Sequence, residues 1–212
     1  MKAAPRAFAK DDQGKRLVVR ADDFGMCHAI NRGITQAFRQ GIVTTSSVMV
    51  PCPWFPEAVR LALELEIPVG IHSTLTCEWP NFRWGPLTEG ASLTESDGTL
   101  WRTVQSAESQ LVVEDATREL FAQARRAENA GLTPTYFDVH MGMTCQAAYD
   151  EVCRKYGFEL VDFRLVAQLS DRPANQKVDW LISFIQSLEP GMNLLVSHPS
   201  VPAEEVRSMA EP

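Results

Sequence analysis

The sequence predicts a single α/β domain built on a parallel sheet, of the distorted or incomplete (β/α) barrel type. Strand-like and helix-like segments alternate along the whole chain, which is the pattern of parallel strands joined by helical crossovers. Six strand segments are present, fewer than the eight of a complete barrel, and no glycine-rich phosphate loop follows the first strand, which disfavours a dinucleotide-binding fold. With 212 residues, 45% of them hydrophobic, the chain can bury one sizeable core.

The first part of the chain contains three of these strands. Residues 17–21 have the apolar run of a buried strand, and apolar residues then recur at helical spacing over 30–38 before a glycine stop. The β-branched run 43–50 predicts the second strand. Pro56 opens a second helix, and residues 68–76 predict the third strand.

A long segment, residues 77–111, then interrupts the alternation. It is rich in Trp, Pro and Gly without a clear period, which is typical of a functional or mobile excursion. The remaining expected elements are helix 114–129, strand 136–140, helix 146–156, strand 160–166, helix 175–188 and strand 193–197. We therefore expect one domain over residues 16–200, with an N-terminal tail at 1–15 and a polar C-terminal tail at 201–212.

Composition argues against several classes of protein. The formal net charge of -7 disfavours nucleic-acid binding, because phosphates need a basic face. No apolar run has the length of a membrane span, and the N-terminus lacks the apolar centre of a secretory signal. The five cysteines form no CxxC pair, so we expect reduced thiols in a cytoplasmic protein.

Acidic and imidazole side chains accompany the predicted strands. Asp22 and Asp23 follow the first strand, and three of the four histidines, His72, His140 and His198, lie in or at the end of later strands. Because the carboxyl ends of parallel strands meet on one face of a βα barrel, we expect these side chains to converge there. The sequence therefore predicts an active-site constellation at that face.

A carboxylate and two imidazoles are a ligand set for zinc or a related divalent ion, and they leave coordination positions open for chemistry. If Asp23 binds the ion, its charge is compensated, and Asp22 beside it is able to accept a proton from water. The fourth histidine, His28, is expected at a solvated position near the start of the first helix. Two neighbouring carboxylates would then divide the roles of ligand and base.

Four short motifs occur in order along the chain: ADDFG after the first strand, GIHSTLT in the third, FDVHMG in the middle and SHPS near the end. Together they resemble the YdjC-like family of carbohydrate deacetylases, a group that includes chitooligosaccharide and hopanoid-pathway deacetylases. The resemblance covers most of residues 16–200.

The resemblance implies a distorted βα barrel and one divalent ion, zinc or magnesium, held by residues equivalent to Asp23, His72 and His140. It implies hydrolysis of an N-acetyl group on an amino sugar or oligosaccharide. By similarity to polysaccharide deacetylases, Asp22 would be the general base, and His198 would protonate the departing amine.

Three further residues are candidates for substrate binding. Arg164, in the strand LVDFRLV, would orient Asp22 or a sugar hydroxyl, or else be a structural arginine. Trp79 and Trp84, with other aromatic residues of the excursion, would form a wall for sugar stacking, or else pin the loop to the barrel.

Two other functions stay open beside the one that the resemblance implies. A phosphoesterase on a similar barrel would need a second metal and more basic residues. A non-catalytic carbohydrate-binding protein is favoured by the sparse polar residues around His140, where Val139 and Gly142 stand. An incomplete barrel with exposed sheet edges also makes a homodimer a reasonable expectation.

Overall fold

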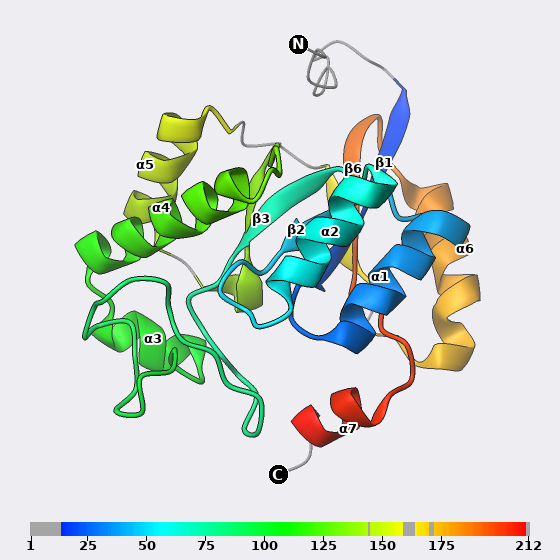
Figure 1. The fold of residues 1–212 in the computed structure, drawn as a ribbon. Coiled ribbons are helices and arrows are strands. Elements are labelled where there is room, and N and C mark those ends of the chain that lie inside the picture. Colours follow the sequence, from blue (N-terminus) through cyan, green and yellow to red (C-terminus); the bar gives the residue numbers. More distant parts are fainter. Residues whose placement is uncertain (1–13, 144, 159–163, 170–171, 211–212) are drawn as a thin grey trace.

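The computed structural model describes residues 14–143, 145–158, 164–169 and 172–210, and within them six parallel strands form one sheet in the order β4-β3-β2-β1-β6-β5 (Figure 1). The strands are β1 Lys15–Phe24, β2 Thr45–Val48, β3 Val69–Ser73, β4 Phe137–Val139, β5 Leu165–Gln168 and β6 Gly191–Ser197. The helices are α1 His28–Gln40, α2 Phe55–Leu65, α3 Val104–Gln110, α4 Val113–Asn129, α5 Gln146–Tyr156, α6 Lys177–Ser187 and α7 Glu204–Ala210. Two 3₁₀ turns, His140–Gly142 and Ala174–Gln176, complete the elements.

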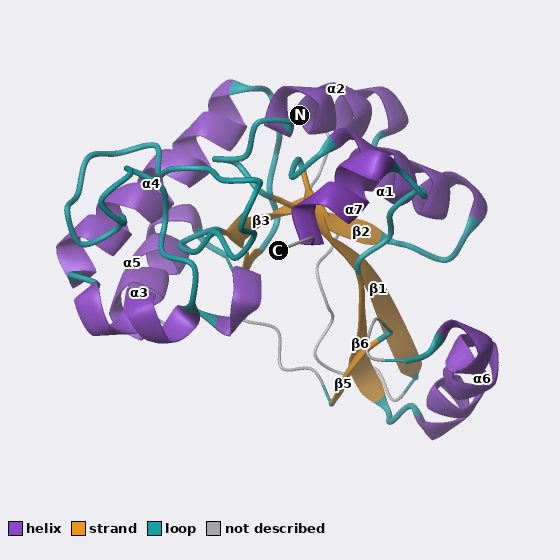
Figure 2. Ribbon diagram, turned by 90° about the horizontal axis from the view of Figure 1, so that it is seen from below, coloured by secondary structure: helices purple, strands orange, loops and turns teal. Residues whose placement is uncertain are grey.

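The sheet curls into a half-barrel with helices on its outer face (Figure 2). Helices α1, α2, α4 and α6 bury apolar residues such as Ile34, Ala58, Ala124 and Phe184 against the strands, and these form the main hydrophobic core. The predicted fold class, a distorted or incomplete (β/α) barrel with parallel strands, is confirmed. Because the strands are parallel, their carboxyl ends share one rim, which is where the functional side chains of such folds converge.

The excursion at residues 77–111 is ordered by buried polar contacts. Arg83 donates hydrogen bonds to the carbonyl oxygens of Cys77 and Leu100 and to Thr99 Oγ1. A second apolar cluster, including Leu93 and Leu100, packs the excursion against α4 and α5. The excursion ends in helix α3, which its irregular composition did not predict.

Helix α7 occupies the region where the sequence predicts a polar tail. Its Glu205 accepts hydrogen bonds from the backbone N–H groups of His28 (3.3 Å) and Ala29 (2.9 Å), at the start of α1. Cys27, the N-cap residue of α1, provides no side-chain cap, so Glu205 satisfies N–H groups that helix geometry leaves without partners. The far end of the chain is thereby tied to the helix that follows the ADDFG turn.

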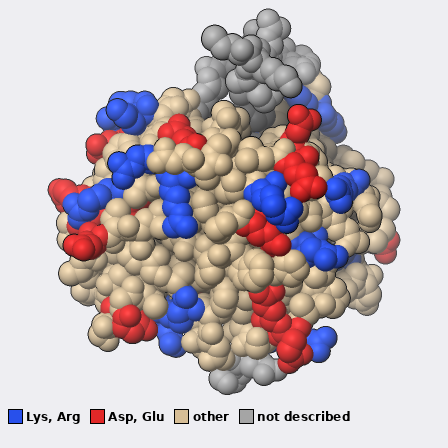
Figure 3. Space-filling view, in the orientation of Figure 1, with Lys and Arg blue, Asp and Glu red and all other residues tan. Residues whose placement is uncertain are grey.

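The last part of the sheet differs from the sequence prediction in its boundaries. A strand is predicted at 160–166, whereas β5 is Leu165–Gln168, and residues 159–163 lie outside the described part of the chain. No helix among the described residues is long and apolar enough to span a membrane. On the face shown in Figure 3, basic and acidic side chains are interspersed rather than gathered by sign.

Candidate metal centre and active-site cleft

The carboxyl end of β1 has an irregular backbone that brings two neighbouring carboxylates to the same cleft. In a regular strand, Asp22 and Asp23 would point to opposite faces of the sheet. The pairing register of β1 with β2 shifts between Ala21 and Phe24, and Asp23 has a left-handed φ of 71°. Both residues, 3% and 8% exposed, therefore line one cleft.

The turn after Asp23 is held by Gly25 and Asn31. Gly25 has φ 104°, and a Cβ there would lie 3.1 Å from Phe55 Cα and 3.2 Å from the Met49 carbonyl oxygen. Its N–H donates to Asn31 Oδ1 (2.7 Å), and Asn31 is fully buried in α1. The glycine of ADDFG is thus required by both backbone conformation and close packing.

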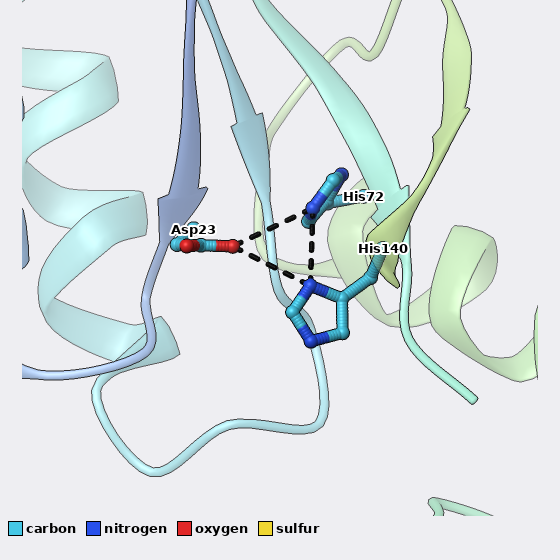
Figure 4. Close-up of side chains that lie close together, drawn as sticks. All are labelled: Asp23, His72 and His140. Carbon is cyan, nitrogen blue, oxygen red and sulfur yellow. Dashed lines mark hydrogen bonds and ion pairs between the residues drawn. The ribbon is translucent and has the colours of Figure 1, made fainter. Parts of the chain in front are cut away.

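Asp23, His72 and His140 form a compact triangle of ligand atoms at this rim (Figure 4). Asp23 Oδ1 lies 3.5 Å from His72 Nε2 and 3.5 Å from His140 Nδ1, and the two nitrogens are 3.3 Å apart. All three residues are buried, and Asp23 Oδ1 has no hydrogen-bond partner among the described residues. The three acceptor atoms therefore face one another with no protein donor between them.

Each imidazole is oriented by a carboxylate on its other nitrogen. His72 Nδ1 lies 3.0 Å from Asp138 Oδ2, and His140 Nε2 lies 3.0 Å from Glu78 Oε2. Since an ionised carboxylate only accepts hydrogen bonds, these nitrogens carry protons, and in the neutral form of each ring the lone pair of the other nitrogen points at Asp23. Such pairing is the usual support for histidines that bind a metal ion.

Charge in the site favours a bound cation. Burial alone would raise the pKa of Asp23, but the two imidazoles hold it well below its usual range. Burial alone would lower the pKa of His72, yet Asp138 and Asp22 raise it, and Asp23 and Glu78 likewise outweigh burial to raise the pKa of His140. Without a metal ion, these carboxylates draw protons onto the imidazoles instead.

The donor set fits a divalent ion. Bonds of about 2.0–2.2 Å in tetrahedral geometry place two ligand atoms of one ion about 3.3–3.6 Å apart, and the observed separations are 3.3–3.5 Å. One carboxylate and two imidazoles also leave a coordination position open. Asp23, His72 and His140 therefore have the chemistry and the spacing of a catalytic metal site.

Asp22 lies beside this triangle and is held by Arg20. Arg20 Nε donates to Asp22 Oδ1 (2.6 Å) and Nη2 to Oδ2 (2.9 Å), and Nη2 also pairs with Asp138 Oδ2 (2.9 Å). Burial, followed by the charge of Asp138, raises the pKa of Asp22, while His72 and Arg20 oppose that rise. Asp22 is thus a buried carboxylate with a fixed orientation.

The cleft above these residues has a volume of about 620 Å³. His198, just beyond β6, is exposed and lines it, as does Trp79 from the excursion. The structure thus brings Asp22, His198 and Trp79 to the cleft that contains the triangle.

Three other residues singled out in the sequence, Trp84, Arg164 and His28, do not line the cleft. Trp84 is 4% exposed, its Nε1 donates to the Thr76 carbonyl oxygen (3.1 Å), and its ring centroid lies 6.4 Å from that of His140; it is not among the residues that line the cleft. Arg164 precedes β5 at the opposite end of the strands from the cleft. His28, which begins α1, lies 2.9 Å from Glu57 Oε1 and is not among the residues that line the cleft.

Sequence reasoning missed Arg20, Glu78 and Asp138. Asp138 stands two residues before His140 and in register with His72 on the neighbouring strand, so the alternation of strand side chains was a usable signal. Glu78 belongs to the excursion, where no periodicity pointed to it. These two carboxylates supply the polar support that Val139 and Gly142 do not.

Known proteins are similar to this chain in sequence. The chain is 41% identical over 126 residues to a carbohydrate deacetylase of Brevibacillus brevis, and 36% identical over 131 residues to a chitooligosaccharide deacetylase of Yersinia enterocolitica. Each match covers 59% of this chain but only 48% and 49% of those proteins, so the chain matches about half the length of these relatives.

The fold is also similar to a solved structure from Enterococcus faecalis, provisionally described as a cellobiose-phosphate cleavage protein. The two share a TM-score of 0.80 and 21% identity, over 92% of this chain and 85% of the other. The family model described as YdjC-like protein matches residues 16–212. That match spans the half-barrel and every residue of the cleft, and the chain belongs to the YdjC-like family.

Proposed function

We propose that this chain is a metal-dependent hydrolase that removes an N-acetyl group from an amino sugar. The observation that carries the proposal is the juxtaposition of a buried, oriented carboxylate, Asp22, with the Asp23–His72–His140 triangle in one cleft. The names of the relatives, carbohydrate deacetylase and chitooligosaccharide deacetylase, support an N-acetylated sugar as substrate.

A divalent ion bound by Asp23, His72 and His140 would supply Lewis-acid chemistry, polarising the acetamide carbonyl and making water more acidic. Asp22 accepts the proton of the attacking water, because its carboxylate is fixed within the same cleft. Burial of Asp22 strengthens this role, since a raised pKa makes the carboxylate a better base.

His198 is suited to the second proton transfer. It lines the cleft and is exposed, so its imidazole reaches solvent protons and the leaving nitrogen alike. In its protonated form it donates to that nitrogen, so that an amine departs rather than an amide anion. Trp79 offers an aromatic face at the same cleft, on which the C–H face of a sugar ring would pack.

The ligand set favours zinc or a similar transition metal over magnesium. Two of the three ligand atoms are imidazole nitrogens, whereas magnesium prefers oxygen ligands and retains several waters. The proposal is therefore a single zinc-like ion in each protein molecule.

The phosphoesterase alternative finds less support in this geometry. A second group of possible ligands, Asp22, His72 and Asp138, lies beside the first, but Arg20 bonds to both of its carboxylates. A guanidinium in that position neutralises the carboxylates that a second ion would need.

The test combines metal analysis with acetate release. The protein is loaded with Zn²⁺, its bound metal is quantified, and acetate is measured with N-acetylglucosamine and its β-1,4-linked oligomers. We expect about one ion per chain. Asp22→Asn should keep the ion and lose about 10²- to 10⁴-fold in kcat, the usual contribution of a general base. Asp179→Asn, a change of an exposed carboxylate on α6, serves as the matched control.

The outcomes separate the candidate functions. His72→Ala and His140→Ala should both lose the ion, and full occupancy in either would contradict the ligand assignment. Bound ion without acetate from any of these sugars would contradict the deacetylase proposal and favour the carbohydrate-binding alternative.

A further inference from the structure

Arg20 joins two parts of the cleft that are distant in the sheet. It lies on β1 two residues before Asp22, so both side chains point to the inner side of the curled sheet. Its fork reaches Asp22 at 2.6 and 2.9 Å and Asp138 of β4 at 2.9 Å, although β2 and β3 separate those strands in the sheet. The guanidinium therefore spans the interior of the half-barrel, where Arg20 is one of the residues that line the cleft.

Without Arg20, the negative charges of Asp22 and Asp138 would repel each other without a neighbouring guanidinium to neutralise them. The ligand atoms of Asp22, His72 and Asp138 all lie within 4.8 Å of one another. The side chains of Asp22 and Asp138 are only 4% and 11% exposed, so solvent screens their repulsion weakly. A bidentate guanidinium both neutralises and orients a carboxylate, which a point charge does less well.

Arg20 has no direct contact with the metal triangle in the described part of the chain, and the two are linked only through Asp138. Asp23, His72 and His140 present Oδ1, Nε2 and Nδ1 to one another, whereas the side-chain partners of Arg20 among the described residues are Asp22 and the outer carboxylate Asp138. Asp138 Oδ2 lies 2.9 Å from Arg20 Nη2 and 3.0 Å from His72 Nδ1, so the two sets of contacts meet at this one oxygen.

We propose that Arg20 is a positioning residue that fixes the orientation of Asp22 for proton transfer and takes no part in holding the ion. This inference rests on the proposed function, since it assigns a partner to the base of that reaction. Removal of the guanidinium should lower kcat and leave KM and metal affinity nearly unchanged.

The experiment compares Arg20→Gln and Arg20→Lys with the wild type, and with Arg60→Gln as a control of an exposed arginine on α2. With the acetylated sugar that the wild type hydrolyses, we expect Arg20→Gln to lose about 100-fold in kcat. Arg20→Lys retains the positive charge but loses the bidentate guanidinium, so its kcat should lie between those of the wild type and Arg20→Gln. Guanidinium ion should restore part of the kcat of Arg20→Ala and none of that of Asp22→Asn.

Two readouts do not depend on turnover. Zn²⁺ affinity, measured by calorimetry, should stay within a few-fold of the wild type in Arg20→Gln. The crystal structure of that variant with its ion should show the Asp22 carboxylate rotated or disordered. Arg20→Lys serves the same comparisons if Arg20→Gln fails to fold.

Several results would overturn the inference. They are wild-type kcat in Arg20→Gln, an unmoved Asp22 carboxylate in the crystal structure of that variant, or a loss in zinc affinity of about 10-fold or more, the effect of losing a carboxylate that orients a ligand. An inactive wild type would instead count against the proposed function, and the position of Asp22 in the zinc-loaded variant would then decide the inference alone.

Discussion

His72 Nδ1 and Asp138 Oδ2 lie 3.0 Å apart on neighbouring strands, at paired positions of the β3–β4 register. The carboxylate fixes the tautomer and orientation of an imidazole whose other nitrogen faces the metal position. Outer partners of this kind contribute about 10- to 100-fold to metal affinity.

Replacement of Asp138 should weaken the binding of the metal ion without removing one of its ligands. We expect Asp138→Asn to raise the Kd for Zn²⁺ by about 10- to 100-fold, measured by calorimetry or chelator competition. Asp150→Asn, at an exposed position of α5, is the control. An unchanged Kd would mean that His72 is oriented by its packing alone.

Substitution of Glu78 should reduce zinc affinity less when the shape of the side chain is retained. Glu78→Gln retains an oxygen acceptor for His140 Nε2 and loses the negative charge, whereas Glu78→Ala removes both. We therefore expect zinc affinity to decrease in the order wild type, Glu78→Gln, Glu78→Ala, in the same titration. Equal affinity in all three proteins would show that this carboxylate does not support His140.

Loss of the Glu205 carboxylate should destabilise α1. Glu205→Ala leaves the N–H groups of His28 and Ala29 without their acceptor, and caps of this type contribute about 1 kcal/mol. Urea denaturation should show that loss in the free energy of unfolding. Glu204→Ala, at the neighbouring exposed position, should change little, and equal effects from both variants would argue against the cap.

Gly33 allows α1 to approach the segment that follows His198. A Cβ at this position would lie 2.4 Å from Ser200 Cα, so the backbone of one segment must move. We expect Gly33→Ala to lower kcat with the ion retained and to lose about 1–3 kcal/mol in unfolding free energy. Gln36→Ala, on the exposed side of the same helix, should retain full activity. Wild-type activity in Gly33→Ala would show that the segment adapts without moving His198.

The thiols should be poorly reactive in the folded protein. Four of the five cysteines are buried, and burial raises the pKa of Cys27 and of Cys77 to about 11. Few of these thiols are ionised at pH 8, and thiolate is the reactive form. A disulfide-exchange reagent at pH 8 should therefore label about one thiol, Cys153, before denaturant is added and five afterwards. Rapid labelling of several thiols in the native protein would contradict this packing.

The sequence was sufficient to predict the sheet and the convergence of its acidic and imidazole residues, because both follow from periodicity and parallel topology. Helix 146–156 was predicted with its observed boundaries, because its apolar spacing ends at the glycine that terminates the helix. Helix α7 was missed because a short, charged segment gains its stability from tertiary contacts, here Met209 in the second apolar cluster and Glu205 on α1.

The partners of the site were harder to predict. Arg20 and Asp138 come together only because the sheet curls, so their contact at 2.9 Å depends on geometry that periodicity does not encode. The excursion presented a similar difficulty, since Trp79 and Trp84 look equivalent in sequence but only Trp79 lines the cleft.

The left-handed backbone at Asp23 decides which substitutions there are informative. Asparagine tolerates that conformation well, whereas alanine and valine are strained in it by their Cβ. Asn at position 23 therefore isolates the loss of a negative ligand, while Ala combines that loss with a distorted turn. A saturation scan of this position should accordingly separate folding yield from zinc content, with Asn and Gly yielding folded protein that binds the ion poorly.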